Sequence, residues 1–212
     1  MNTWQEKLKG VFVPMVTPFR KDEILYSGIR SNVERWNTAD LTGYFVLGTN
    51  GEYKSLTIKE RFRVLDTVVR ASASNKVIMA GCGAESTRET IELIREASYR
   101  GATMASILMP SFFAKSITED VMVDFITEVA DNSPIPVVLY NNPAVAAGVA
   151  ISYPVLCRVS QHPNVVGIKD SSKDTYKENL KAASSSFSVL AGSANYFLDL
   201  LQQRGTGGVL SL

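Results

Sequence analysis

The sequence predicts an α/β protein with the fold of a (β/α)₈ barrel (a TIM barrel), formed by residues 1–212 as a single domain. Short apolar runs alternate with amphipathic stretches eight times along the chain. Most of these runs are almost continuously apolar, which is typical of strands buried on both faces of a parallel sheet. Strict alternation of strand and helix favours a parallel sheet, and eight units suit a closed barrel better than a doubly wound sheet of about five or six strands.

Each expected element follows from its own local pattern. The apolar runs predict strands at residues 10–19, 43–48, 76–81, 104–110, 135–140, 165–169, 187–192 and 207–212. The amphipathic patterns between them predict helices that include residues 57–71, 87–99, 118–131 and 174–183. Residues 86–89 read as a capping box, and Thr118 and Asp174 are expected N-caps. Gly101 and Gly205 stand where helices are expected to end.

The last expected strand ends at Leu212, the final residue of the sequence. We therefore expect the sequence to be incomplete, lacking the last barrel helix and any helical region beyond it. A barrel without that helix would leave one flank of apolar strand uncovered.

The composition narrows the class of protein. Lys plus Arg number 22 and Asp plus Glu 21, a net charge of +1 that argues against nucleic acid or an anionic membrane as partner. The apolar runs are too short to span a bilayer and the polar N-terminus shows no signal peptide, so we expect a cytoplasmic protein. Two cysteines and one histidine argue against a disulfide scaffold and most zinc sites, so we expect no metal and no cofactor. The histidine, His162, lies in a predicted turn and reads as a plain loop residue.

Reactive groups of a barrel lie at the carboxyl ends of its strands and in the loops that follow. This rule selects a short set of positions in the sequence, namely Thr17, residues 48–52, Cys82, Phe112, Phe113, Tyr140, Lys169 and Ser193. Among eleven lysines, Lys169 alone closes an apolar run. Desolvation there would lower its pKa and free the neutral amine to attack a carbonyl carbon, although a strand-end lysine can also simply reach out to solvent.

Tyr140 and a glycine-rich turn accompany this lysine. Tyr140 ends the strand expected beside that of Lys169, and a phenol there could shuttle protons for imine formation and carbon–carbon cleavage. Taken alone, it would equally be an aromatic residue at the barrel rim. The turn Gly48-Thr-Asn-Gly-Glu52 suits backbone N–H groups that converge on an anion such as the carboxylate of a 2-oxo acid, with the Thr49 hydroxyl as another donor. As a bare pattern it is also compatible with an ordinary tight loop.

Four ordered motifs, at residues 16–19, 48–52, 138–141 and 167–170, resemble those of the dihydrodipicolinate synthase and N-acetylneuraminate lyase family. Within it, Asn50 and the runs at residues 81–87 and 190–194 most resemble 4-hydroxy-2-oxoglutarate aldolases. The resemblance implies that Lys169 is the Schiff-base lysine, Tyr140 the proton-relay tyrosine and Thr49 its partner. It also implies a homo-oligomer, by resemblance a homotetramer, and a set of substrate-binding residues: Gly48, Asn50, Gly51, Phe113, Gly192, Ser193 and Leu210.

Three departures from the family pattern matter. Residues 111–113 offer no phenol where the synthases have a tyrosine, Val145 stands where they have an arginine, and the C-terminal helical region is missing. We expect a class I, pyruvate-dependent aldolase, a lyase that cleaves or forms a 4-hydroxy-2-oxo acid or a 2-keto-3-deoxy sugar acid. Two alternatives stay open: a synthase that condenses pyruvate with aspartate semialdehyde, and a catalytically inert barrel that binds a 2-oxo acid.

Overall fold

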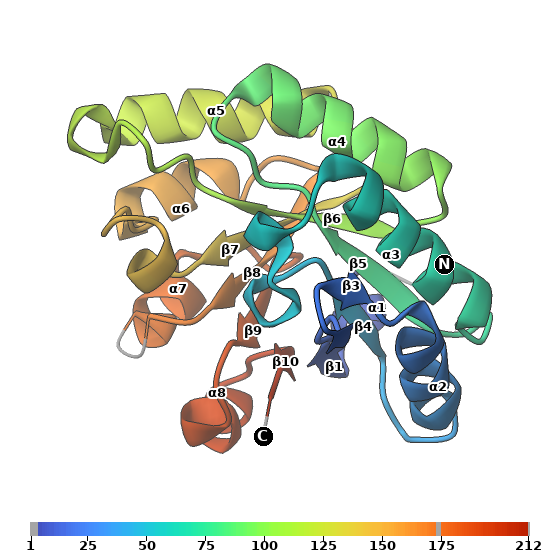
Figure 1. Cartoon of the computed structure of the whole chain (residues 1–212). Helices are drawn as coiled ribbons and strands as arrows, with labels where there is room; N and C mark the ends of the chain where they lie inside the picture. Colours follow the sequence, from blue (N-terminus) through green and yellow to red (C-terminus); the bar gives the residue numbers. More distant parts are fainter. Residues whose placement is uncertain (1–3, 173–174, 212) are drawn as a thin grey trace.

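Eight parallel strands close into a barrel in the computed structural model, which describes residues 4–172 and 175–211 (Figure 1). Each strand pairs with the next along the chain, and the last pairs with the first through the register Gly10↔Gly207. The predicted fold class is therefore confirmed. The strands are β1 (Gly10–Pro14), β4 (Gly43–Val46), β5 (Val77–Gly81), β6 (Met104–Leu108), β7 (Val137–Asn141), β8 (Val165–Asp170), β9 (Ser188–Ala191) and β10 (Gly207–Val209).

The first strand is shorter than the apolar run that predicted it. β1 ends at Pro14, and the end of the run, predicted as strand to residue 19, belongs to a small antiparallel hairpin of β2 (Phe19–Arg20) and β3 (Glu23–Ile24). The chain leaves the barrel because Pro18 has no N–H for a ladder and its carbonyl accepts from Leu25 N at 2.8 Å. The last strand was predicted to reach Leu212; it ends at Val209, and Leu212 lies outside the described residues.

Helices on the connections form the outer ring in Figure 1. A short helix, α1 (Trp4–Leu8), precedes the barrel and buries Leu8 completely against its interior. The four predicted helices are present, as α3, α4, α5 and α7. The remaining connections carry α2, α6 and α8, and the bounds are α2 (Tyr26–Asn37), α3 (Ile58–Ala71), α4 (Thr87–Tyr99), α5 (Glu119–Asp131), α6 (Tyr153–Val159), α7 (Tyr176–Ala182) and α8 (Phe197–Gln202).

Side-chain caps start several of these helices. Ser86 and Thr118 accept hydrogen bonds from the backbone of Glu89 and Val121, at 3.2 and 3.3 Å, as their positions predicted. The capping box predicted at residues 86–89 forms only this one of its two bonds. Both bonds of a capping box form between Thr57 and Glu60, at the start of α3. The other predicted N-cap, Asp174, lies outside the described residues.

The two predicted helix-ending glycines behave differently. Gly101 follows α4 with a φ of +100°, as expected of a C-terminal glycine. Gly205 also follows a helix end, that of α8, as predicted, but there Arg204, with a φ of +69°, takes the left-handed conformation. Gly205 is needed for space, because a Cβ there would lie 1.9 Å from Leu200 Cδ2.

The core has two layers. One lies between the strands and the helices, and the other fills the barrel interior with Leu8, Phe12, Phe45, Met79, Met104, Val138, Tyr140, Val166, Leu190 and Val209. Burial of each large apolar side chain contributes about 1.5–3 kcal/mol. Because these side chains fill the barrel interior, reactive groups are expected at the carboxyl ends of the strands, where Tyr140 lies.

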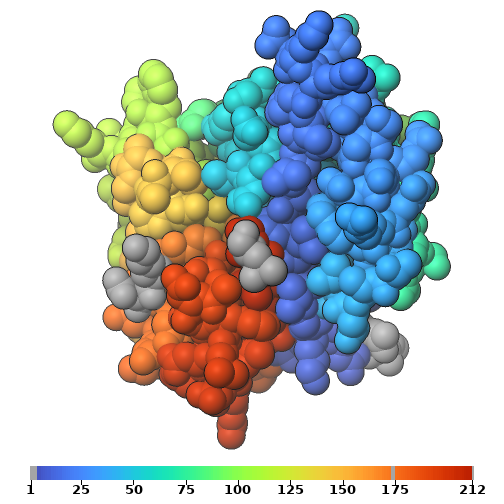
Figure 2. Space-filling model, turned by 60° about the horizontal axis from the view of Figure 1, so that its bottom comes forward, coloured from blue at the N-terminus to red at the C-terminus, as the bar shows by residue number. Residues whose placement is uncertain are grey.

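One flank of the barrel is covered less than the others. Val11 and Val13 of β1 are only half-buried, whereas all four residues of β4 are fully buried. Figure 2 shows the N-terminal segment that contains β1 at the surface, between the part of the chain around α8 in red and α2 in lighter blue. Among the described residues, no helix has the length and apolar character required to cross a membrane.

Candidate active site

Lys169 and Tyr140 are brought together by the pairing of β7 with β8. They are direct partners in the register, and their side chains are 4% and 6% exposed. The Lys169 Nζ atom lies 3.9 Å from the centre of the Tyr140 ring and 4.9 Å from that of Phe45. Phe45 in turn meets the Tyr140 ring edge-on, with centroids 5.9 Å apart. The amine thus lies in an aromatic pocket at the carboxyl ends of the strands.

Burial is the main influence on the amine. It lowers the pKa of Lys169 from its ordinary value, and interaction with Tyr140 opposes this shift only in part. No carboxylate forms an ion pair with Lys169 among the described residues. The neutral amine, which is the nucleophilic form, is therefore more available than in an exposed lysine.

The Tyr140 hydroxyl has two polar partners. It lies 3.2 Å from Thr49 Oγ1 and accepts a hydrogen bond of 2.9 Å from Asn142 Nδ2. Burial alone would raise the pKa of Tyr140, but Lys169 and the hydrogen bonds from Thr49 and Asn142 outweigh it, and the pKa is lowered. The phenol is therefore poised to exchange a proton with groups beside Lys169.

The glycine-rich turn after β4 forms a single turn of 3₁₀ helix, Thr49–Gly51. It lies between two non-glycine residues in the left-handed region, Leu47 with φ +60° and Glu52 with φ +52°. Such conformations persist only where the surrounding structure enforces them. The N–H groups of Thr49 and Asn50 donate to no acceptor in the described part of the chain, so they are free for an anion.

Contacts from the neighbouring segment hold this turn in place. The buried hydroxyl of Thr17 donates to the Gly51 carbonyl at 2.7 Å. A Cβ at Gly48 would lie 2.6 Å from the Phe45 ring, so no side chain fits there without displacing an aromatic residue of the pocket. Gly48, Asn50 and Gly51 are predicted substrate-binding residues, and the hydrogen bond between Thr49 and Tyr140 links their turn to the Lys169 site. Their contact with substrate stays a prediction.

Asp170, the residue after the lysine, fixes the end of β8. Its carboxylate is 1% exposed and accepts five hydrogen bonds, from Asn141 Nδ2, Ser172 N, Ser172 Oγ, Thr175 Oγ1 and Asn179 Nδ2. These donors come from β7, from the loop after β8 and from α7. A buried carboxylate satisfied in this way holds the backbone that carries Lys169.

Of the predicted residues after β9 and β10, Gly192 contacts this framework directly. Gly192 N donates to the carbonyl of Asp170 at 2.7 Å, and a Cβ at Gly192 would lie 2.1 Å from Ser171 Oγ. Ser193 caps a short turn by accepting from Asn195 N at 3.3 Å. Leu210 N donates to the carbonyl of Phe12 at 3.1 Å. Contact of Gly192, Ser193 and Leu210 with substrate stays a prediction.

Comparison with known proteins decides the family. A family model described as the dihydrodipicolinate synthetase family matches residues 7–212. The chain belongs to this family. L-threo-3-deoxy-hexylosonate aldolase of Aspergillus niger is 38% identical over 175 residues, 79% of this chain and 52% of that protein. A protein of Coccidioides immitis named putative 4-hydroxy-2-oxoglutarate aldolase, mitochondrial, is 33% identical over 204 residues, 93% of this chain and 65% of that protein.

Solved structures support the same assignment to the dihydrodipicolinate synthetase family. The chloride-inhibited dihydrodipicolinate synthase from Acinetobacter baumannii, complexed with pyruvate, matches with a TM-score of 0.89 and 27% identity over 97% of this chain and 70% of that chain. This chain spans about half to two thirds of the length of the two aldolase relatives. The resemblance predicted from the four motifs is confirmed.

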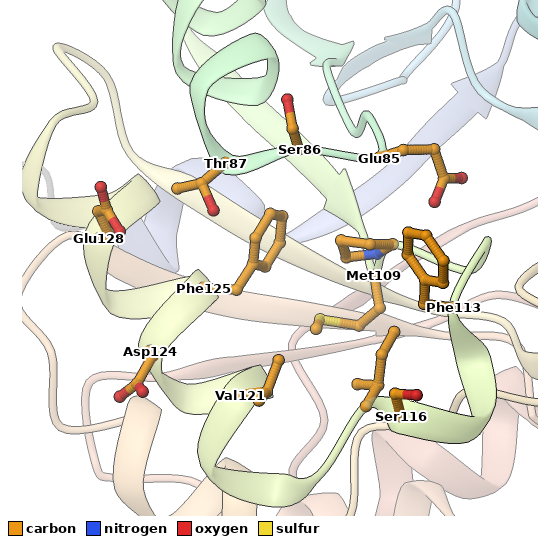
Figure 3. Close-up of a pocket in the computed structure, with 12 residues that line it drawn as sticks. Glu85, Ser86, Thr87, Met109, Phe113, Ser116, Val121, Asp124, Phe125 and Glu128 are labelled. Atoms are coloured by element: carbon orange, nitrogen blue, oxygen red, sulfur yellow. The ribbon is translucent and has the colours of Figure 1, made fainter.

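Phe113, a predicted substrate contact, lies in a different pocket from that of Lys169. A cavity of about 600 Å³ opens between α4 and α5, and the Phe113 and Phe125 side chains form part of its wall (Figure 3). Phe113 is 73% exposed and meets Phe112 edge-on, with ring centroids 4.8 Å apart. Its contact with substrate stays a prediction.

The remaining candidates read as structural residues in this dihydrodipicolinate synthetase family barrel. Cys82 is buried, and burial raises the pKa of its thiol to about 12, so it is no nucleophile at neutral pH. His162 Nε2 lies 3.0 Å from Asp131 Oδ1 in a surface turn. In residues 4–172 and 175–211, no three His, Cys, Asp or Glu side chains gather to hold a metal ion.

Sequence reasoning missed the residues that hold the site. Phe45 read only as a buried strand residue, and Asn142 and Asp170 as neighbours of the candidates. The only signal was proximity to Tyr140 and Lys169 in the sequence. Proximity in the sequence does not predict that Asn142 Nδ2 donates to the Tyr140 hydroxyl or that the Asp170 carboxylate accepts five hydrogen bonds.

Proposed function

We propose that this chain is the barrel of a class I, pyruvate-dependent aldolase that acts through an imine on Lys169. The observation that carries the proposal is the buried amine of Lys169 against the Tyr140 ring, with the Tyr140 hydroxyl bonded to Thr49. Two relatives are named as a 3-deoxy-hexylosonate aldolase and a putative 4-hydroxy-2-oxoglutarate aldolase, which supports the proposal. The substrate would be a 4-hydroxy-2-oxo acid or a 2-keto-3-deoxy sugar acid.

The proposed reaction starts with the neutral Lys169 amine, which attacks C2 of the 2-oxo acid. With one proton taken up, which the final hydrolysis returns, water leaves and a protonated imine forms. A base takes the proton of the C4 hydroxyl, the C3–C4 bond breaks, and its electron pair moves through C2 to the imine nitrogen. The aldehyde leaves, and the remaining enamine takes a proton at C3. Water then hydrolyses the imine to pyruvate and the free amine. The imine is the electron sink, so the steps need no cofactor.

The other residues supply proton transfer and anchoring in this proposal. Tyr140 would carry protons, and its hydrogen bonds with Thr49 and Asn142 beside the amine support this role. The free N–H groups of Thr49 and Asn50 would bind the carboxylate at C1, which fixes C2 near Lys169.

Borohydride with pyruvate tests the covalent step. We expect reduction of the imine to add a stable mass to the peptide that contains Lys169 and to no other lysine peptide, as measured by peptide mass spectrometry. Protein treated with borohydride alone is the control. Trapping on another lysine, or no trapping on active protein, would contradict the assignment of Lys169.

Aspartate semialdehyde distinguishes the aldolase from the synthase alternative. Val145, at the end of the 3₁₀ turn Pro143–Val145, offers no positive charge to the carboxylate of this aldehyde. Leaving a charge-assisted hydrogen bond unmade costs on the order of 1.5–3 kcal/mol, or about one to two decades in kcat/KM. We expect condensation with aspartate semialdehyde to be slower than cleavage of 4-hydroxy-2-oxo acids. A condensation tenfold faster than cleavage of 4-hydroxy-2-oxoglutarate would establish the synthase instead.

The third possibility, an inert barrel that binds a 2-oxo acid, is separated from both enzymes by turnover of the full-length protein.

We expect pyruvate release in the presence of EDTA at the rate seen without it, because the imine needs no metal. A reproducible loss of pyruvate release that a divalent ion reverses would contradict the mechanism.

A homotetramer and a cytoplasmic location remain part of the proposal, and one relative is named as mitochondrial.

A further inference from the structure

A small pocket adjoins the Lys169 site at the mouth of the barrel. Its volume is about 220 Å³, room for several groups the size of a water molecule at about 30 Å³ each. One wall is Thr49, whose hydroxyl contacts Tyr140, so the pocket begins where the bond to be cleaved would lie. Atoms of a substrate beyond C4 would enter it. Its lining residues are Thr49, Glu52, Tyr53, Lys54, Ser55, Leu108 and Val145.

The charges around this pocket do not suit a second carboxylate. Lys54 is the one cationic residue in the lining, and its Nζ lies 3.7 Å from Glu85 Oε1. Glu52 adds a carboxylate to the same lining, and Val145 adds no charge. Among the residues that line the pocket, a second carboxylate of a substrate would therefore meet no unpaired positive charge, and it would lose hydration without a full replacement.

Tyr53 offers a neutral polar group in the same wall. Its ring is half-buried and lies between two cations, with Arg61 Cζ 5.2 Å and Lys54 Nζ 5.5 Å from its centre. Arg61 is itself held by a bond of 3.2 Å from Nε to the carbonyl of Leu56. The Tyr53 hydroxyl makes no hydrogen bond with any residue in the described ranges. Burial raises the pKa of Tyr53 above its ordinary value, so its hydroxyl is protonated at neutral pH.

We infer that this pocket is the subsite for the departing aldehyde and that the Tyr53 hydroxyl determines its specificity for a neutral, hydroxylated chain. The inference rests on the proposed aldolase function. A phenol both donates and accepts, which suits an alcohol, and the ring and Leu108 suit the C–H groups between alcohols. The preferred substrate is then a 2-keto-3-deoxy-hexonate, with hydroxyls at C5 and C6, over the dicarboxylate 4-hydroxy-2-oxoglutarate.

Three substrates and two variants test this inference through pyruvate release. Wild-type, full-length protein is expected to show a kcat/KM about tenfold higher for the 2-keto-3-deoxy-hexonate than for 4-hydroxy-2-oxoglutarate. The same tenfold preference is expected over 4-hydroxy-2-oxohexanoate, which lacks the distal hydroxyls. Tyr53→Phe keeps the ring and its cation contacts, and should reduce this second preference to less than about threefold. Tyr99→Phe, at a position 87% exposed, is the matched control and should retain it.

The outcomes distinguish failure of the subsite inference from failure of the proposed aldolase function. If Tyr53→Phe lowers kcat/KM equally for the hydroxylated and the deoxygenated substrates, its role is structural and the inference fails. Faster cleavage of 4-hydroxy-2-oxoglutarate by the wild type also overturns it, while the borohydride adduct on Lys169 would still support the aldolase. No pyruvate from any substrate, with no adduct, would overturn both.

Discussion

Lys169→Met is expected to lower pyruvate release by on the order of 10⁴-fold or more, the scale of loss when an enzyme loses its nucleophile. Methionine is similar in length and fits the aromatic pocket of Phe45 and Tyr140, but its thioether cannot form an imine. Steady-state turnover of a 4-hydroxy-2-oxo acid measures the loss, and the borohydride adduct should vanish with it. Residual turnover above about one per cent of wild type would show that Lys169 does not form the obligatory intermediate.

The same variant should be more stable than the wild type, which separates lost chemistry from unfolding. Burial lowers the pKa of Lys169 below its ordinary 10.5 in the folded state. Between that lowered pKa and 10.5 the unfolded chain binds more protons than the folded protein, so the free energy of unfolding of the wild type rises with pH. Methionine does not titrate, so the variant lacks the destabilisation that the buried, charged Lys169 causes at lower pH. The gain in Tm should therefore be largest at low pH and should shrink as the pH approaches 10.5.

Lys76 supplies a matched control for a buried lysine. It is 9% exposed at the opposite end of the barrel, where Nζ donates to the carbonyls of Ala39 and Leu41 at 3.0 and 2.7 Å. Lys76→Met leaves these partners unsatisfied and should lose on the order of 1–3 kcal/mol of stability while the adduct on Lys169 still forms. The two buried lysines therefore have opposite effects on stability: Lys76 stabilises the fold, and Lys169 destabilises it.

The barrel could be predicted from the sequence because its determinants are local and repeated. A run such as residues 165–169 is apolar at nearly every position, and only a strand covered on both faces requires this. Eight such runs leave few other closed arrangements. The same logic placed Lys169 and Tyr140 together, because the ends of adjacent parallel strands must meet, and the register confirms the pair.

What the sequence did not predict depends on side-chain directions and on contacts between distant loops. Phe113 follows β6 as expected, yet its ring lies in the wall of the pocket between α4 and α5. The cause is Glu85, whose carboxylate accepts the backbone N–H groups of Ser111 and Phe112 and so fixes that loop beside α4. The sequence pattern does not predict this hydrogen bond, because Glu85 and Ser111 are 26 residues apart. Tyr53 was missed for the same reason, since its place depends on how the loop after β4 folds.

Tyr140→Phe is expected to lower turnover by about 10²–10³-fold, the usual range for a lost proton-transfer group. The ring stays in its edge-on contact with Phe45, so the aromatic pocket and the fold should be retained. Only the hydroxyl that joins Thr49 and Asn142 beside Lys169 is removed. The adduct with pyruvate and borohydride should still form, more slowly, because the amine keeps its burial.

Thr49→Val shows whether Tyr140 acts through this hydrogen-bonded chain. If the two hydroxyls form one proton path, the double variant Tyr140→Phe/Thr49→Val should be little slower than Tyr140→Phe alone, because the second change interrupts a path already broken. Independent roles would instead multiply the two losses. Tyr44→Phe is the matched control, since its hydroxyl bonds Asn37 at 2.9 Å outside the site, and it should affect stability more than turnover. A loss of less than fivefold in Tyr140→Phe would mean that water or another hydroxyl carries the proton.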